Sequence, residues 1–143
     1  MKALRSLVLA LLVASPVALS EGSAPADPLG DNLFPPDLIL SSQAAIGLTD
    51  AQKADVRAEV LKVQPKFTDL QWKLQDAVDG LKAVLAAPTA DEAKVLEALD
   101  RVLALERDLK RSQIGLMVRL KNLLSADQQG KLRQAKARGK TVG

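Results

Sequence analysis

Two short stretches place a hydroxyl side chain three residues before a glutamine. They are LTDAQ at residues 48–52 and LSADQ at residues 124–128. At this spacing the hydroxyl can accept a hydrogen bond from a backbone N–H, and the glutamine can return one to the backbone of the hydroxyl residue. The chemistry is helix initiation, worth about 0.5 to 2 kcal/mol at each N-cap. The motif residues are Leu48, Thr49, Gln52, Leu124, Ser125 and Gln128.

A third version of this pattern pairs Thr89 with Glu92. A Ser or Thr followed three residues later by Glu or Gln is a general signal for the start of a helix. The sequence therefore predicts three helix starts, just after Thr49, Thr89 and Ser125.

Other side-chain chemistry is sparse, because the 143-residue chain contains no histidine and no cysteine. Imidazole is the usual general base near neutrality, and imidazole and thiolate are the usual ligands of zinc and nickel. We therefore expect no enzyme activity, no cofactor and no site for a soft metal. A hard-cation site built from carboxylates stays open, although it has no recognisable spacing. Nucleic-acid binding is not expected either, since three aromatic residues offer no stacking platform.

Two long amphipathic helices are predicted between the motifs, because apolar residues recur there every three or four positions. The first runs from about residue 50 to 86 and the second to about residue 123. Pro65 lies inside the first helix, and the apolar stripe continues in phase beyond it, so we expect a kink rather than an end. The break at residues 87–89 is short, and the two helices should therefore form an antiparallel hairpin.

Two shorter helices complete an all-α fold of four helices built on the long antiparallel helical hairpin. One is expected over residues 37–46, begun by Pro35-Pro36 and ended by Gly47. The other is expected from about residue 126 to 138.

The N-terminal residues have the features of a secretory signal peptide. Lys2 and Arg5 precede an apolar run, and the small residues Ala18 and Ser20 suit a cleavage site. We expect a signal peptide over 1–20, an irregular N-terminal arm over 21–36, a helical domain over 37–138 and a disordered tail over 139–143. The mature chain, from residue 21, is expected in the periplasm.

The paired motifs around a long hairpin resemble the Spy/CpxP family of periplasmic LTxxQ-motif proteins, over about residues 31–138. Its relatives include zinc-resistance-associated and nickel/cobalt-sensing periplasmic proteins. The resemblance implies a homodimer shaped as a curved cradle. Members similar to Spy hold unfolded or misfolded proteins without ATP, and those similar to CpxP damp a membrane sensor kinase. The sensing relatives bind metal through histidines, which this sequence lacks.

The resemblance therefore implies a chaperone or envelope-stress protein whose partners are unfolded or misfolded envelope proteins. The alternative is a periplasmic regulator, or a heavy-metal-resistance or sensor-type protein, that acts on a membrane signalling partner. An adjacent gene for a sensor kinase would favour that alternative.

Charge is distributed unevenly along the chain. Residues 21–106 carry 8 basic and 15 acidic side chains, whereas residues 107–143 carry 10 basic and 2 acidic ones. Attraction from the basic third would capture a non-native chain, and apolar side chains along the hairpin would then hold it. The candidate client-binding residues are Lys62, Lys66, Phe67, Arg111, Ile114, Met117 and Arg119.

Other roles for these surfaces stay open at this point. Leu96, Leu103, Ile114 and Met117 could instead pack against the first and fourth helices or against a dimer mate. Trp72, the single tryptophan, suits either a contact site or a place beneath a second protomer. The basic run over residues 131–140 is equally compatible with a solvated tail.

Overall fold

The computed structural model describes residues 29–140 as four helices with no strand among them. The predicted signal peptide, most of the predicted arm and residues 141–143 lie outside the described residues. The helices are α2 (Pro36–Ser41), α3 (Asp50–Leu85), α4 (Glu92–Asn122) and α5 (Ala126–Lys140). The all-α prediction is confirmed for the described part of the chain.

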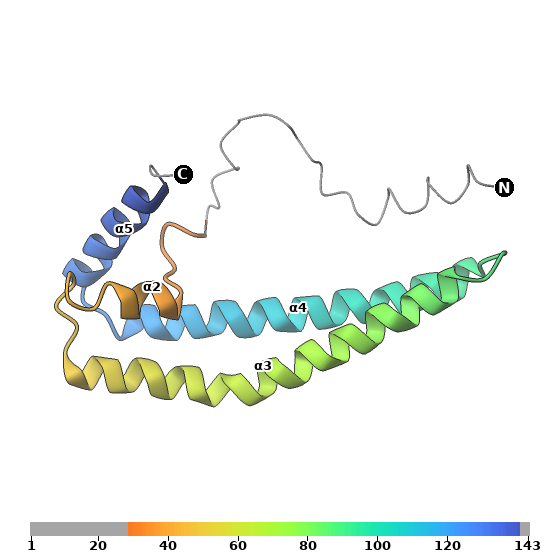
Figure 1. The fold of residues 1–143 in the computed structure, drawn as a ribbon, viewed down its shortest axis with the longest axis horizontal. Helices are drawn as coiled ribbons and strands as arrows, with labels where there is room; N and C mark the ends of the chain where they lie inside the picture. The colour runs from red at the N-terminus through yellow and green to blue at the C-terminus, as the bar shows by residue number, and fades with distance from the viewer. Residues whose placement is uncertain (1–28, 141–143) are drawn as a thin grey trace.

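The two long helices form the predicted hairpin. Figure 1 shows α3 and α4 side by side, running in opposite directions and joined by a short loop at one end of the molecule. With 36 and 31 residues, the helices are each roughly 50 Å long at 1.5 Å per residue. Helices α2 and α5 lie at the opposite end of the hairpin.

The start of α4 corrects one prediction. Its N-cap is Asp91 and not Thr89, and the Asp91 carboxylate accepts a hydrogen bond from the backbone N–H of Lys94 at 3.3 Å. Aspartate is as good an N-cap as threonine. Because the helix begins after Asp91, Glu92 becomes its first residue and stands too early to reach back to the N-cap, so the capping box predicted from Thr89 does not form.

Two other helix ends differ from the predicted ones. Helix α2 ends at Ser41 and not at residue 46, and turns follow it up to Gly47. Helix α5 continues to Lys140, two residues beyond its predicted end, so Gly139 and Lys140 are helical and not part of a disordered tail.

Gly47 nevertheless ends a helical turn, as predicted. Its φ of 65° lies in the left-handed region that glycine adopts without strain. The backbone N–H of Gly47 donates to the carbonyl of Ala44, and that of Leu48 donates to the carbonyl of Gln43, at 3.3 and 2.9 Å. This pair of bonds is the Schellman arrangement, and it turns the chain directly into the first motif.

Helix α3 is continuous through Pro65, so the prediction that the proline does not end the helix is confirmed. The helix also changes direction partway along its length, in the yellow-green part of the ribbon in Figure 1. An internal proline removes one backbone hydrogen bond and crowds the preceding turn. We attribute the bend to this residue.

The main core lies at the end of the hairpin where all four helices meet, which we call the base. Phe34 precedes α2 and is fully buried there, although the sequence places it in the irregular arm. The buried residues of the base are Phe34, Ile39, Ile46, Leu48, Val56, Leu120, Leu124 and Leu132. Beyond the base the hairpin is only two helices thick, with buried residues such as Leu70, Leu81 and Val102. No helix in the described part of the chain is long and apolar enough to cross a membrane.

Candidate functional site

Both motifs form the predicted capping boxes. The backbone N–H of Gln52 donates to Thr49 Oγ1, and the backbone N–H of Thr49 donates to Gln52 Oε1, each at 3.1 Å. In the second motif the backbone N–H of Gln128 donates to Ser125 Oγ at 3.1 Å, and that of Ser125 donates to Gln128 Oε1 at 2.9 Å. Each motif therefore starts its helix, α3 or α5, as predicted.

The two glutamine side chains also bond to each other across the base. Gln52 Nε2 donates to Gln128 Oε1 at 2.9 Å, and Gln128 Nε2 donates to Gln52 Oε1 at 2.9 Å. The second N–H of each amide donates to a carbonyl just before the other helix. Gln52 reaches Leu123 O at 2.9 Å, and Gln128 reaches Gly47 O at 3.3 Å. We call this pair of amides the amide lock.

The amide lock uses the full hydrogen-bonding capacity of both side chains. A primary amide offers two donors and two acceptor lone pairs, and all of them have partners here. The arrangement is nearly symmetric, because each amide contacts the carbonyl two residues before the opposite N-cap. With Leu48 and Leu124 buried in the core, the motif residues fix how α3 and α5 begin against each other.

A groove between the two long helices brings together three of the candidate client-binding residues, Lys66, Arg111 and Arg119. Lys66 belongs to α3, and the two arginines belong to α4. We call it the cationic groove, and its lining consists of Val63, Lys66, Asp108, Arg111, Ser112, Gly115 and Arg119. The lining therefore carries three cationic side chains and one carboxylate.

An ion pair holds one wall of this groove. Arg119 Nε lies 2.8 Å from Glu59 Oε2, which joins α4 to α3, and Lys62 Nζ lies 2.7 Å from Glu59 Oε1. The hydrogen bond from Lys62, and then the one from Arg119, holds the pKa of Glu59 below its ordinary value. Lys62 is thus engaged with Glu59 and is not part of the groove lining.

Of the remaining candidate residues, Ile114 and Met117 belong to a second apolar stripe on α4, and Phe67 lies on α3. Leu96, Leu103 and Ile114 are separated by seven and eleven residues, about two and three turns, and so share one face of α4. Leu96 and Leu103 are about half exposed, while Ile114 and Met117 are partly buried. We call these four residues the α4 stripe. Phe67 is partly buried on α3.

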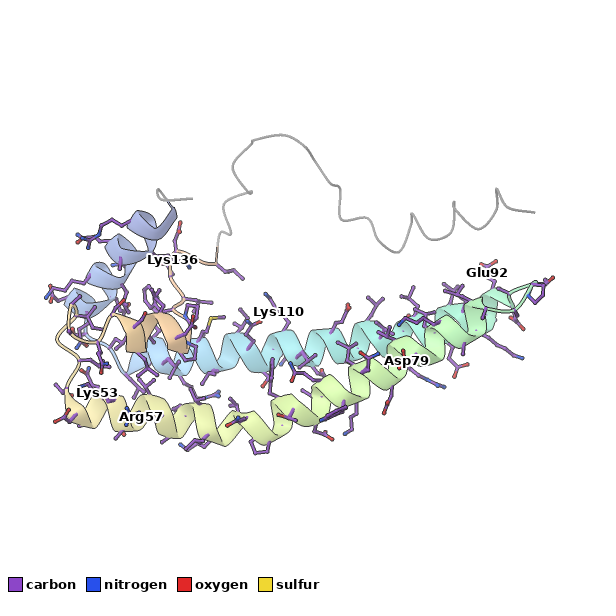
Figure 2. The ribbon with its side chains drawn as sticks, viewed as in Figure 1. Lys53, Arg57, Asp79, Glu92, Lys110 and Lys136 are labelled. Carbon is purple, nitrogen blue, oxygen red and sulfur yellow. The ribbon has the colours of Figure 1, made fainter. Side chains whose placement is uncertain are left out.

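The α4 stripe meets basic side chains at Ile114. A depression lined by Lys110, Arg111, Ile114 and Gly115 adjoins it, and Lys110 extends from α4 away from α3 in Figure 2. Arg111 and Gly115 line both this depression and the cationic groove. The apolar and cationic surfaces therefore meet on α4.

Other exposed features lie elsewhere on the molecule. Trp72 is 69% exposed, and Leu61 is 65% exposed three turns away on the same face of α3. That face points away from the buried Leu70. In the basic run, Lys131 pairs with Asp127 at 3.1 Å, and Lys136 donates to the carbonyl of Gly30, which ties α5 to the segment before α2.

Groups of three or more acidic side chains close enough to hold a metal ion are absent from residues 29–140. The whole chain offers no histidine or cysteine ligand. Sequence reasoning missed the amide lock, because its two halves are 76 residues apart and nothing in either motif indicates that they meet.

The sequence pattern of a family described as heavy-metal resistance matches residues 5–131, most of the chain. No curated protein and no solved structure matches.

Proposed function

The chain belongs to the heavy-metal-resistance family, and from this premise we propose that it is an ATP-independent chaperone that holds non-native proteins in the periplasm. The family is part of a wider group of Spy/CpxP-like periplasmic helical proteins. The periplasmic location and the chaperone activity are our proposals, in line with the predicted signal peptide and the LTxxQ motifs.

One observation carries the proposal, the junction of the α4 stripe with the cationic groove. An apolar side chain beside basic ones, as Ile114 lies beside Lys110 and Arg111, suits loose binding of many sequences, because apolar contact needs no fixed geometry and charge draws the partner in from a distance. The flexible thioether of Met117 adds to that tolerance. A thin hairpin gives a client a long surface to lie on.

A light-scattering assay tests this proposal. A chemically unfolded client is diluted into buffer with and without residues 21–143 of the protein, with no nucleotide present. We expect aggregation to be suppressed at a near-equimolar ratio, and high salt to slow capture because it screens the attraction. Unchanged aggregation with several unrelated clients would refute the proposal.

A matched pair of variants locates the surface. Leu103→Ser with Ile114→Ser should weaken suppression, because both side chains belong to the α4 stripe. Leu61→Ser, on the outer face of α3, should leave it intact. Equal effects of the two variants would show that the client does not bind at the α4 stripe.

Family membership favours a second candidate, a metal-responsive regulator that acts on a membrane signalling partner. The donor set of this chain does not fit a heavy-metal site, since zinc, nickel and copper prefer imidazole and thiolate ligands and the chain has neither. Calorimetric titration with each ion should therefore give no saturable heat. Saturable binding, together with capture of one stoichiometric membrane protein, would favour the regulator.

A further inference from the structure

We infer that the cationic groove is a carboxylate subsite, which makes the protein prefer apolar segments that carry an acidic residue. The inference rests on the proposed function and names the class of client. Capture by overall charge does not require the basic side chains to lie close together. In the cationic groove, however, Lys66, Arg111 and Arg119 line one site.

The first support is that two basic side chains in the groove lining have no partner among the described residues. Within residues 29–139, whose side chains the structure describes, Lys66 and Arg111 make no hydrogen bond or ion pair through their side chains. The one carboxylate in the lining, Asp108, lies 3.5 Å from Arg107 Nε. Two positive charges from facing helices therefore share one groove with no counter-charge bound to either.

The second support is that Arg119 is held in place. Its Nε is bonded to Glu59, and this bond leaves the two Nη groups of the guanidinium to other acceptors. A guanidinium in a fixed orientation is a good partner for a carboxylate, since its planar N–H groups match the two oxygens. Glu59 acts here as a positioning residue.

The third support is the glycine in the groove lining. Gly115 has no side chain, and a Cβ placed there would lie 3.4 Å from the guanidinium of Arg119. Gly115 and Arg111 also line the depression that contains Ile114. If a carboxylate of a client segment binds in the groove, apolar residues next to it in that segment would therefore lie near the α4 stripe. Acidic and apolar residues close together in sequence are what this surface fits.

Two peptides test the subsite. Both are fluorescent and share one extended apolar sequence, with a central glutamate in one and a glutamine in the other. Binding to residues 21–143 is measured by fluorescence anisotropy. We expect the glutamate peptide to bind roughly fivefold more tightly, the size of effect that partly exposed ion pairs give.

Variants assign the preference to the groove. Lys66→Gln with Arg111→Gln should remove most of the preference for glutamate and leave the affinity for the glutamine peptide within about twofold. Lys73→Gln with Arg101→Gln is the matched control, since it removes the same charge from α3 and α4 outside the groove. Gly115→Leu should also reduce the preference, because it adds a side chain to the groove lining beside Arg119 while all three cations remain.

Three outcomes would overturn the inference. Equal affinity of the wild-type protein for both peptides is the first, and equal losses in the groove and control variants is the second. In both cases the glutamine peptide still binds, so the proposed chaperone function stands. If neither peptide binds and aggregation is not suppressed, the proposed function fails and the subsite fails with it.

Discussion

Gln52 and Gln128 each carry out two tasks with one amide. Each closes the capping box of its own helix, and each bonds to the other side chain and to the backbone before the other helix. An isolated capping box stabilises only its own helix start. Here the same atoms also fix the position of α3 against α5, because an amide that moves away loses several partners at once.

Removing one half of the amide lock should therefore cost more than losing an ordinary cap. Gln128 is only 7% exposed, and Gln128→Ala leaves part of the Gln52 amide and the carbonyl of Gly47 without partners. We expect the free energy of unfolding to fall by about 1 to 3 kcal/mol, measured by urea denaturation.

Gln75→Ala is the control for this change, because the Gln75 amide bonds only to the exposed Asp79 on its own helix. The double variant Gln52→Ala with Gln128→Ala should be less destabilised than the sum of the two single variants. Strictly additive losses would show that the two amides do not cooperate.

Glu59 gives a prediction for pH. Its pKa is lowered in the folded protein by hydrogen bonds from Lys62 and Arg119, so the unfolded chain binds this proton more readily. The stability that Glu59 contributes is therefore complete above its ordinary pKa of 4.5 and is lost as pH falls through the lower, folded value. The melting temperature of the wild type should fall more steeply below about pH 4.5 than that of Glu59→Gln. The same dependence of melting temperature on pH in both proteins would contradict this.

At the scale of the elements, two glycines should respond to alanine in opposite directions. Gly80 lies inside α3, and a Cβ there meets nothing within 4 Å, so Gly80→Ala should raise stability by about 0.5 to 1 kcal/mol. Gly47 has a φ of 65°, and Gly47→Ala should lower stability by about 1 kcal/mol or more. Thermal unfolding of the two variants measures both effects. A change of the same sign in both would refute the explanation from backbone conformation.

The bend in α3 gives a prediction about shape. Pro65→Ala restores a backbone donor and removes the clash of the proline ring, so α3 should straighten and the helix should gain stability. Small-angle scattering of the mature chain measures the change as a shifted distance distribution. An unchanged profile would mean that packing against α4, and not the proline, sets the bend.

The lengths and starts of the helices can largely be predicted from local sequence patterns. The spacing of apolar residues such as Val56, Leu70 and Leu81 predicts the length and buried face of α3, because a helix repeats every 3.6 residues. The helix starts at Thr49 and Ser125 are also predictable from local sequence, because a capping box links residues only three positions apart. The prediction at Thr89 is wrong because Asp91, two residues later, caps the helix instead.

Long-range contacts could not be predicted in this way. The burial of Phe34 depends on where α2 meets the base, and the amide lock depends on two motifs meeting after the hairpin folds back. For the site, sequence reasoning proposed Lys66, Arg111 and Arg119 as candidate client-binding residues. It did not show that they line one groove, or that Lys62 is engaged with Glu59, because both facts depend on how α3 and α4 are aligned.

For the whole molecule, the main core and the proposed binding surface lie in different parts of the hairpin. The base contains most of the fully buried side chains and the amide lock, while the α4 stripe and the cationic groove lie along the hairpin. Changes to the proposed binding surface outside the Glu59–Arg119 ion pair should therefore cost little stability. The homodimer stays a prediction, and the mass of the mature chain in solution tests it.

The central claim is that the α4 face of the hairpin holds non-native proteins. Site-specific photo-crosslinking tests it most directly, with a photoreactive residue in place of Leu103 on the α4 stripe or, as the control, in place of Leu61 on the outer face of α3. Each protein is irradiated with one client, in its unfolded and in its native form. We predict strong crosslinks from position 103 to the unfolded client, and weak ones from position 61 or to the native client. Equal crosslinking from both positions, or none to the unfolded client, would contradict the claim.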